Sequence, residues 1–182
     1  MMKKTAAILL AAAAGLCMLT GCQDARTEEK SGVTVQEQGS SSYISALKEC
    51  FNASYTIGGG EVFYAYMYPD AVLDALRADG NYDALISTFN EGQKKRLENS
   101  TDNFTFGNVT DSHEINETQT VAAKSYLKSI SEMYLPSLTE DQLDIKEGYE
   151  VTFNTLNNGV SQGSETVLVV RLNDEGWKVI TG

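Results

Sequence analysis

The residues that could carry chemistry in this chain are few, and the most informative of them is a cysteine. Cys22 follows a basic start, Lys3 and Lys4, and an uncharged stretch over residues 5–20 that is rich in Ala and Leu. This stretch is too short and too weakly apolar for a spanning helix, and it is typical of an export leader that is cleaved. We therefore expect a mature chain that begins at Cys22.

The run Leu19-Thr20-Gly21-Cys22 follows this leader directly and resembles the lipobox of bacterial lipoproteins. The resemblance implies that a peptidase cuts before Cys22 and that the thiol carries a diacylglyceryl group. Two acyl chains hold a protein stably at a membrane, whereas one gives only marginal binding. The alternative is an ordinary secretory leader with an incidental cysteine, such as Cys17. The lipobox predicts lipidation at Cys22 and a location on the extracytoplasmic face of the cell membrane.

The charge of the chain restricts its partners. The full chain has a net charge of -11, and loss of a leader with two lysines and no acid leaves the mature part near -13. Anionic lipid headgroups and nucleic-acid phosphates repel such a protein, so we expect no nucleic-acid partner. The membrane is then reached through the lipid anchor. The same excess of acids also keeps a domain soluble, and this is the simpler interpretation.

Cys50 is the one cysteine left after Cys17 is removed and Cys22 is modified, so no intramolecular disulfide is expected. It lies three residues after Leu47 and beside Phe51, which predicts a small buried hydrophobe. A catalytic thiol needs a cation or a histidine base beside it, and the sequence around Cys50 offers neither pattern.

His113 is the sole imidazole and the main candidate for acid–base chemistry. It shares strand parity with Val109, so it faces the interior if Val109 does, but a lone strand histidine is more often structural. No histidine or cysteine cluster has the spacing of a zinc site, and the acidic run over residues 139–144 lacks the spacing of a calcium loop. We assign no catalytic, cofactor-binding or metal-binding residue.

Two other runs admit a functional and a structural interpretation. Gly58-Gly59-Gly60 lacks the Lys-Ser or Lys-Thr that completes a phosphate-binding loop, and it predicts a flexible joint. The aromatic run over residues 63–68 suits either the lining of a ligand pocket or a helix that covers a sheet, and core packing is the simpler of the two.

The chain divides into a signal peptide (1–21), a lipidated N-terminus with a flexible tether (22–42) and a single α+β domain (43–182). Apolar spacing predicts helices near residues 44–55, 61–67, 69–78, 82–97 and 116–134. Alternation predicts strands at residues 103–115, 149–154, 166–172 and 177–180, with the third central because both of its faces are apolar. A change of parity near Gly107 predicts a β-bulge.

This order of elements, together with Gly-Trp-Lys-Val at 176–179, resembles the nuclear-transport-factor-2-like superfamily and also the cystatin-like arrangement. The chain is also similar to small lipoproteins of Gram-positive bacteria in three runs: Tyr-Met-Tyr-Pro-Asp at 66–70, Val-Leu-Asp-Ala-Leu at 72–76 and the same Gly-Trp-Lys-Val at 176–179. The resemblance implies N-terminal helices packed on a curved, four-stranded, mainly antiparallel sheet that forms a cone. Its motifs are structural rather than catalytic.

Three functions follow from the sequence and stay open at this point. The first is a non-catalytic ligand-binding or protein-interaction module at the cell envelope, whose partner is an unknown protein or small molecule. The second is a small enzyme of the isomerase, dehydratase or hydrolase type with a buried acid or base in the cone. The third is a structural accessory subunit of an envelope complex. None of them calls for a cofactor.

Overall fold

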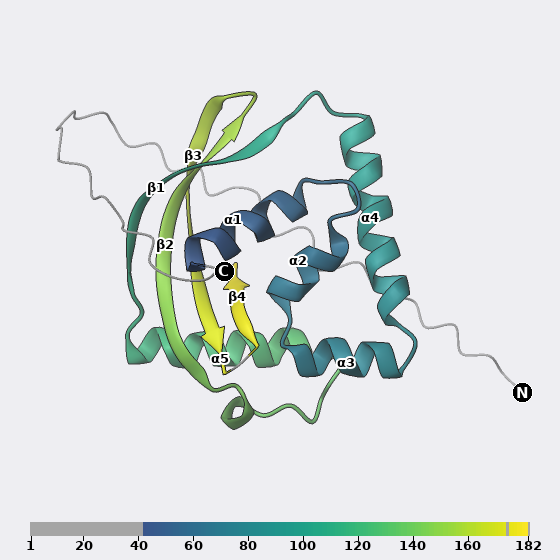
Figure 1. The fold of residues 1–182 in the computed structure, drawn as a ribbon, viewed down its shortest axis with the longest axis vertical. Helices are drawn as coiled ribbons and strands as arrows, with labels where there is room; N and C mark the ends of the chain where they lie inside the picture. Colours follow the sequence, from purple (N-terminus) through teal and green to yellow (C-terminus); the bar gives the residue numbers. More distant parts are fainter. Residues whose placement is uncertain (1–41, 174, 182) are drawn as a thin grey trace, which may run out of the picture. The chain divides into compact units, whose positions relative to one another are not determined.

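The computed structural model describes residues 42–173 and 175–181 (Figure 1). The leader, Cys17, Cys22 and all of the predicted tether except Ser42 lie outside these residues. The elements follow in the order α1 (Tyr43–Ser54), α2 (Gly60–Met67), α3 (Asp70–Ala78), α4 (Tyr82–Glu98), β1 (Phe104–Glu114), α5 (Glu117–Ser131), the 3-10 helix η1 (Glu140–Gln142), β2 (Ile145–Asn157), β3 (Val160–Leu172) and β4 (Gly176–Ile180). The predicted α+β class is confirmed.

The four strands form one antiparallel sheet in the order β1-β2-β3-β4, and this sheet is open rather than closed. The predicted central strand, β3, pairs with both β2 and β4. Helix α5 joins β1 to β2 and starts at a capping box, in which Asn116 and Gln119 exchange hydrogen bonds. The helix ends at Ser131, three residues before the predicted end.

Strand β1 changes its inward face at two places. The pairing with β2 shifts between Phe106 and Val109, and again between Val109 and Asp111. The first shift is the bulge predicted near Gly107, where an added Cβ would lie 2.6 Å from a backbone carbonyl oxygen of β2. The second shift was not predicted. It places His113 on the face opposite to Val109, so the expectation that both share a face is wrong.

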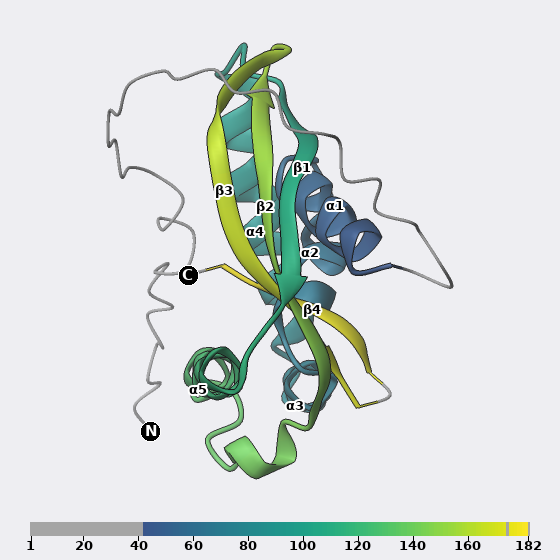
Figure 2. The ribbon, with the colours of Figure 1, turned by 90° about the vertical axis from the view of Figure 1, so that its left-hand side faces the viewer.

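Each face of the sheet carries its own hydrophobic cluster. Residues of α1 and of the strands form the first cluster, whose buried members are Leu47, Cys50, Phe51, Val151, Phe153, Val167, Val169 and Val179. Residues of α3, α5 and the strands form most of the second, which includes Val72, Leu73, Leu76, Ala123, Leu127, Val170, Leu172 and Ile180. Neighbouring strand residues belong to different clusters because they point to opposite faces. Figure 2 accordingly shows α1 and α5 on opposite sides of the sheet.

The β2–β3 hairpin is longer than the sequence analysis predicted. Its strands continue through residues 155–165, beyond the predicted ends, as a polar extension. Asn158 and Gly159 form its two-residue turn, with φ values of 51° and 79°. Positive φ at both turn residues matches the right-handed twist of the strands, which is why Asn-Gly is favoured there.

Candidate functional site

The chain passes from one face of the sheet to the other beside β4, at residues 65–70. At this crossing Lys178 of β4 is 1% exposed, and its Nζ donates to the carbonyl oxygen of Ala65 at 3.1 Å and to Asp70 Oδ1 at 2.8 Å. A second carboxylate oxygen, Glu175 Oε2, lies 3.8 Å from the same Nζ. We call these four residues the crossing cluster.

The crossing cluster joins the end of α2 to the start of α3. Glu175 Oε2 also accepts a hydrogen bond at 2.9 Å from the backbone N–H of Asp70, the first residue of α3. Pro69 precedes that residue and provides the extended backbone, with φ −55° and ψ 146°, from which the helix starts. Three oxygen atoms surround the Lys178 ammonium, so this cluster is built as an anchor of the fold and not as a free nucleophile.

Two of the three sequence runs on which the Gram-positive resemblance depends therefore meet in space. Asp70 ends the run at 66–70, and Lys178 belongs to the run at 176–179. Their 2.8 Å contact spans 108 positions of the chain. Asp70 and Lys178 therefore have a structural role, which agrees with the expectation that these motifs are structural rather than catalytic.

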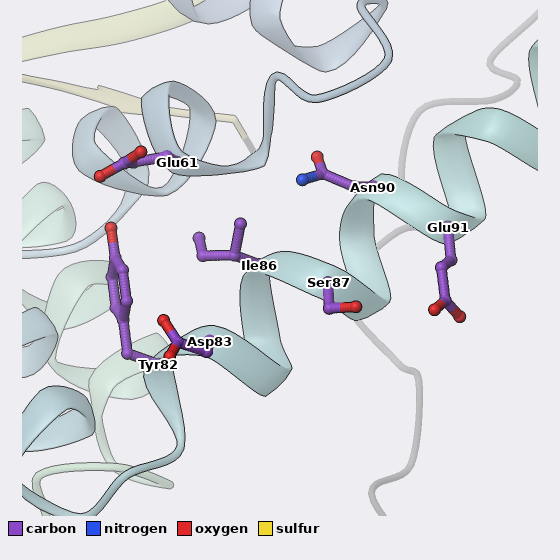
Figure 3. Close-up of a pocket in the computed structure, with 7 residues that line it drawn as sticks. All are labelled: Glu61, Tyr82, Asp83, Ile86, Ser87, Asn90 and Glu91. Carbon is purple, nitrogen blue, oxygen red and sulfur yellow. The ribbon is translucent and has the colours of Figure 1, made fainter.

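A groove of about 410 Å³ lies between α2 and α4 (Figure 3). Glu61 stands on the α2 side, and the residues on the α4 side include Tyr82, Asp83, Ile86 and Glu91. The Tyr82 hydroxyl points toward Glu61, and Ile86 lies between the acidic residues of the two helices (Figure 3). The groove therefore combines an apolar floor with carboxylates at its rim.

Packing between the two helices keeps this groove in place. Asn90 Oδ1 accepts a hydrogen bond at 2.9 Å from the N–H of Gly60, which satisfies one of the open donors at the start of α2. Below it the Phe89 ring stacks on Phe63 with ring centres 4.7 Å apart and meets Tyr64 edge-on at 5.4 Å. Helix α4 is thus fixed to α2 through one side of its surface.

The aromatic run over residues 63–68 packs helices rather than lining this groove, since none of its members is among the groove residues. Tyr64 stacks on Tyr68 at 5.6 Å, and Tyr66 donates to Glu49 at 2.6 Å. Burial, with a smaller contribution from Tyr134, raises the pKa of Tyr64 to about 12. These phenols stay uncharged near neutral pH and act as packing groups and hydrogen-bond donors.

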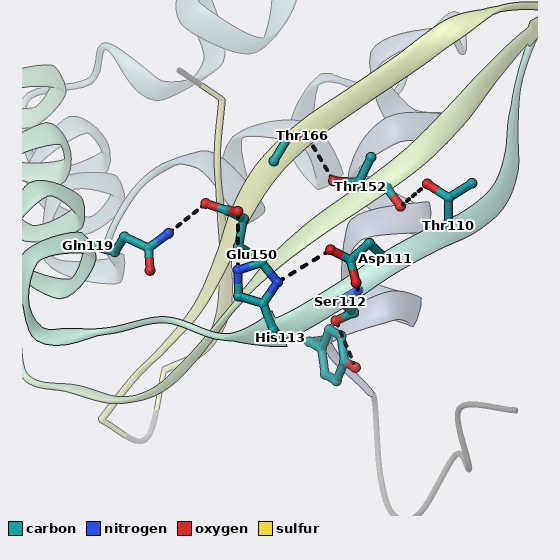
Figure 4. Close-up of polar contacts among 9 residues, drawn as sticks. Thr110, Asp111, Ser112, His113, Gln119, Glu150, Thr152 and Thr166 are labelled. Atoms are coloured by element: carbon teal, nitrogen blue, oxygen red, sulfur yellow. Dashed lines mark hydrogen bonds and ion pairs between the residues drawn. The ribbon is translucent and has the colours of Figure 1, made fainter. Parts of the chain in front are cut away.

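His113 lies on the exposed face of β1, between two carboxylates (Figure 4). Its Nδ1 is 3.5 Å from Asp111 Oδ2, its Nε2 is 3.3 Å from Glu150 Oε1, and 53% of its side chain is exposed. Gln119 of α5 donates to the other Glu150 oxygen at 2.6 Å. The imidazole therefore stands on a polar surface and not in an apolar cavity.

Hydroxyl groups continue this polar surface across the strands. The hydroxyls of Thr152 and Thr166 are 2.9 Å apart, and Thr110 donates to the carbonyl oxygen of Thr152 at 3.2 Å (Figure 4). Ser164 donates to Asn154 Oδ1 at 2.8 Å one row further along the hairpin. The face of the sheet beyond α5 is thus polar, whereas the part beneath α5 is apolar.

We expect His113→Ala to change the free energy of unfolding by less than about 1 kcal/mol, because contacts between exposed charged groups contribute little. Urea unfolding followed by circular dichroism measures this. Thr105→Ala, at an exposed position of the same strand, serves as a control for substitution in β1. A loss well above 1 kcal/mol would show that the imidazole holds β1 to β2.

Cys50 is 4% exposed and belongs to the first hydrophobic cluster, so the predicted small buried hydrophobe is confirmed. Burial raises the pKa of its thiol to about 12. The thiol is therefore uncharged near neutral pH, and the thiolate that a nucleophile needs is scarce.

The two remaining runs have structural roles. Residues 139–144 contain η1, and the carboxylates of Glu140 and Asp144 contact Ser125 and Lys146. Within the glycine joint, Gly59 is tightly packed, because a Cβ there would lie 2.1 Å from the carbonyl oxygen of Ala53, whereas Gly58 has open space around it and a φ of 87°. Within residues 42–173 and 175–181, no group of three or more His, Cys, Asp or Glu side chains could hold a metal ion.

No family model, curated protein or solved structure matches this chain. No helix among the described residues is both long and apolar enough to cross a membrane.

Proposed function

We propose that the protein is a lipid-anchored, extracytoplasmic, non-catalytic binding or interaction module, held at the cell envelope by a diacylglyceryl group on Cys22. The leader and the Leu19-Thr20-Gly21-Cys22 run support the anchor. The position of His113 supports a binding role rather than a catalytic one, because the sole imidazole stands on an exposed polar surface with 53% of its side chain in solvent. The other reactive candidates, Cys50 and Lys178, are held in packed or hydrogen-bonded positions.

We further propose that the fold is the cone of the nuclear-transport-factor-2-like or cystatin-like kind. Two observations support it. The register shifts in β1 bend a sheet at that edge, and α1 lies on the face where Phe106 and Phe153 point inward. In the catalytic members of such a family the cone holds an acid or base. Here Leu47, Phe51 and the aromatic rings around them occupy the corresponding space.

The anchor is tested by growing bacteria that express the full chain with an alkyne-bearing fatty acid and coupling a dye to the alkyne. We expect the wild type to be labelled and to sediment with membranes, and we expect Cys22→Ala to be unlabelled. Cys17→Ala is the matched control, because that residue lies in the leader and should leave labelling unchanged. An unlabelled wild type would contradict the anchor.

A further inference from the structure

We infer that the groove between α2 and α4 is a docking site for a lysine side chain of a partner protein. This inference rests on the proposed function, because it names the surface and the partner chemistry of an interaction module. The site consists of Glu61 of α2 and of Tyr82, Asp83, Ile86 and Glu91 of α4.

The carboxylates of the groove lack partners within the chain. Glu61, Asp83 and Glu91 make no side-chain hydrogen bond or ion pair with any other residue that the structure describes, and all three are exposed. Two other acids nearby are paired with bases: on α3 Asp74 holds Arg77 at 2.8 Å, and on α4 Glu98 holds Lys94 at 3.7 Å. The groove is therefore a place where negative charge remains available to a ligand.

The shape of the groove favours an alkylammonium group. Ile86 and the Tyr82 ring are partly buried and offer an apolar floor along which a chain of methylenes can lie. Glu61 and Asp83 come from different helices and lie near the two ends of the Tyr82 side chain (Figure 3), so an ammonium beside that ring would have a negative charge on either side. Arg77 lies over the Tyr82 ring, with its guanidinium carbon 4.5 Å from the ring centre, so this ring already accepts a cation from the chain itself.

The charge of the whole protein supports the same partner. A mature net charge near -13 attracts basic proteins over a distance and raises their rate of association. The groove then supplies the local contact, in which a lysine stem is desolvated on Ile86 while its ammonium stays near carboxylates and water.

The test uses n-pentylammonium as a probe, which carries a lysine-like charge on an alkyl chain, and n-pentanol as its neutral match. The purified full chain, labelled with ¹⁵N and kept in a non-ionic detergent, is titrated with each probe while its amide resonances are recorded. We expect saturable shifts confined to the starts of α2 and α4, weakened by added salt, with pentylammonium only.

The double variant Glu61→Gln and Asp83→Asn should weaken binding of pentylammonium about fivefold to tenfold, because each exposed charge contributes modestly. Glu117→Gln is the matched control, since Glu117 is an acid in the first turn of α5 and lies outside the groove. Any of three results would overturn the inference: equal shifts with pentanol, shifts spread over all acidic positions, or saturable shifts that Mg²⁺ produces and pentylammonium does not. The wild-type titrations decide this even if the double variant unfolds, and fatty-acid labelling of Cys22 is scored separately.

Discussion

Replacement of Phe153 by alanine is expected to lower the free energy of unfolding by about 3 to 5 kcal/mol, the largest loss that we predict for a single residue. The Phe153 ring is 1% exposed and lies in the middle of the first cluster. It stacks on Phe106 with ring centres 4.6 Å apart and meets Phe51 edge-on at 5.8 Å. Truncation opens a cavity that these rings can fill only in part.

Urea unfolding of the full chain, followed by circular dichroism, measures this loss. Val160→Ala is the matched control, because Val160 is 65% exposed at the tip of the same hairpin and its truncation should cost less than about 0.5 kcal/mol. A loss below about 1 kcal/mol for Phe153→Ala would mean that α1 does not pack on the sheet through this ring.

Lys178→Ala should lower the free energy of unfolding by about 3 kcal/mol, because truncation of a buried and paired lysine leaves a cavity and unpaired polar groups. The substitution removes three buried methylenes and the ammonium, and it leaves the carbonyl oxygen of Ala65 without its donor. The Asp70 side chain is 53% exposed, so its carboxylate regains water and limits the loss. Lys178→Met retains the volume of the stem, and we expect about half the loss for it.

The same urea titration separates these variants. Lys48→Ala, at an exposed position of α1, controls for loss of a lysine and should change the free energy of unfolding by less than about 0.5 kcal/mol. Equal stability of Lys178→Ala and the wild type would show that the crossing cluster does not hold α2 and α3 to β4.

The helices and most strands could be predicted because their apolar residues repeat with the period of one buried face. The extension of the β2–β3 hairpin could not be predicted in this way, since residues 155–165 are mostly polar and strand pairing there depends on backbone bonds. One local pattern was available. Asn158-Gly159 is the dipeptide that favours a two-residue hairpin turn, and it marks the tip correctly.

His113 shows the limit of parity arguments along a strand. The face of the sheet on which His113 lies was inferred from Val109, four positions earlier. This inference is valid only if the strand alternates without interruption between the two residues. The second register shift, between Val109 and Asp111, reverses that side. Glycine at 107 gave a clue to the first shift, but no residue type marks the second.

The candidate groove and the crossing cluster escaped the sequence analysis for different reasons. Lys178 sits between apolar residues on a strand, with Val179 and Ile180 after it, and a lysine in such a run is expected at the surface. Its burial depends on Asp70, far away in the chain. The groove depends on how α4 packs against α2. This packing is set by the contact between Phe63 and Phe89, which no local sequence pattern reveals.

The place of β4 in the chain bears on the order in which the molecule can be assembled. Helices α1 to α3 are synthesised first, yet the strand surfaces that they cover, including Val169, Val179 and Ile180, are synthesised last. These contacts join residues that are far apart in the chain, and contacts of this kind slow folding. These contacts between the helices and β4 can therefore form only after β4 has left the ribosome.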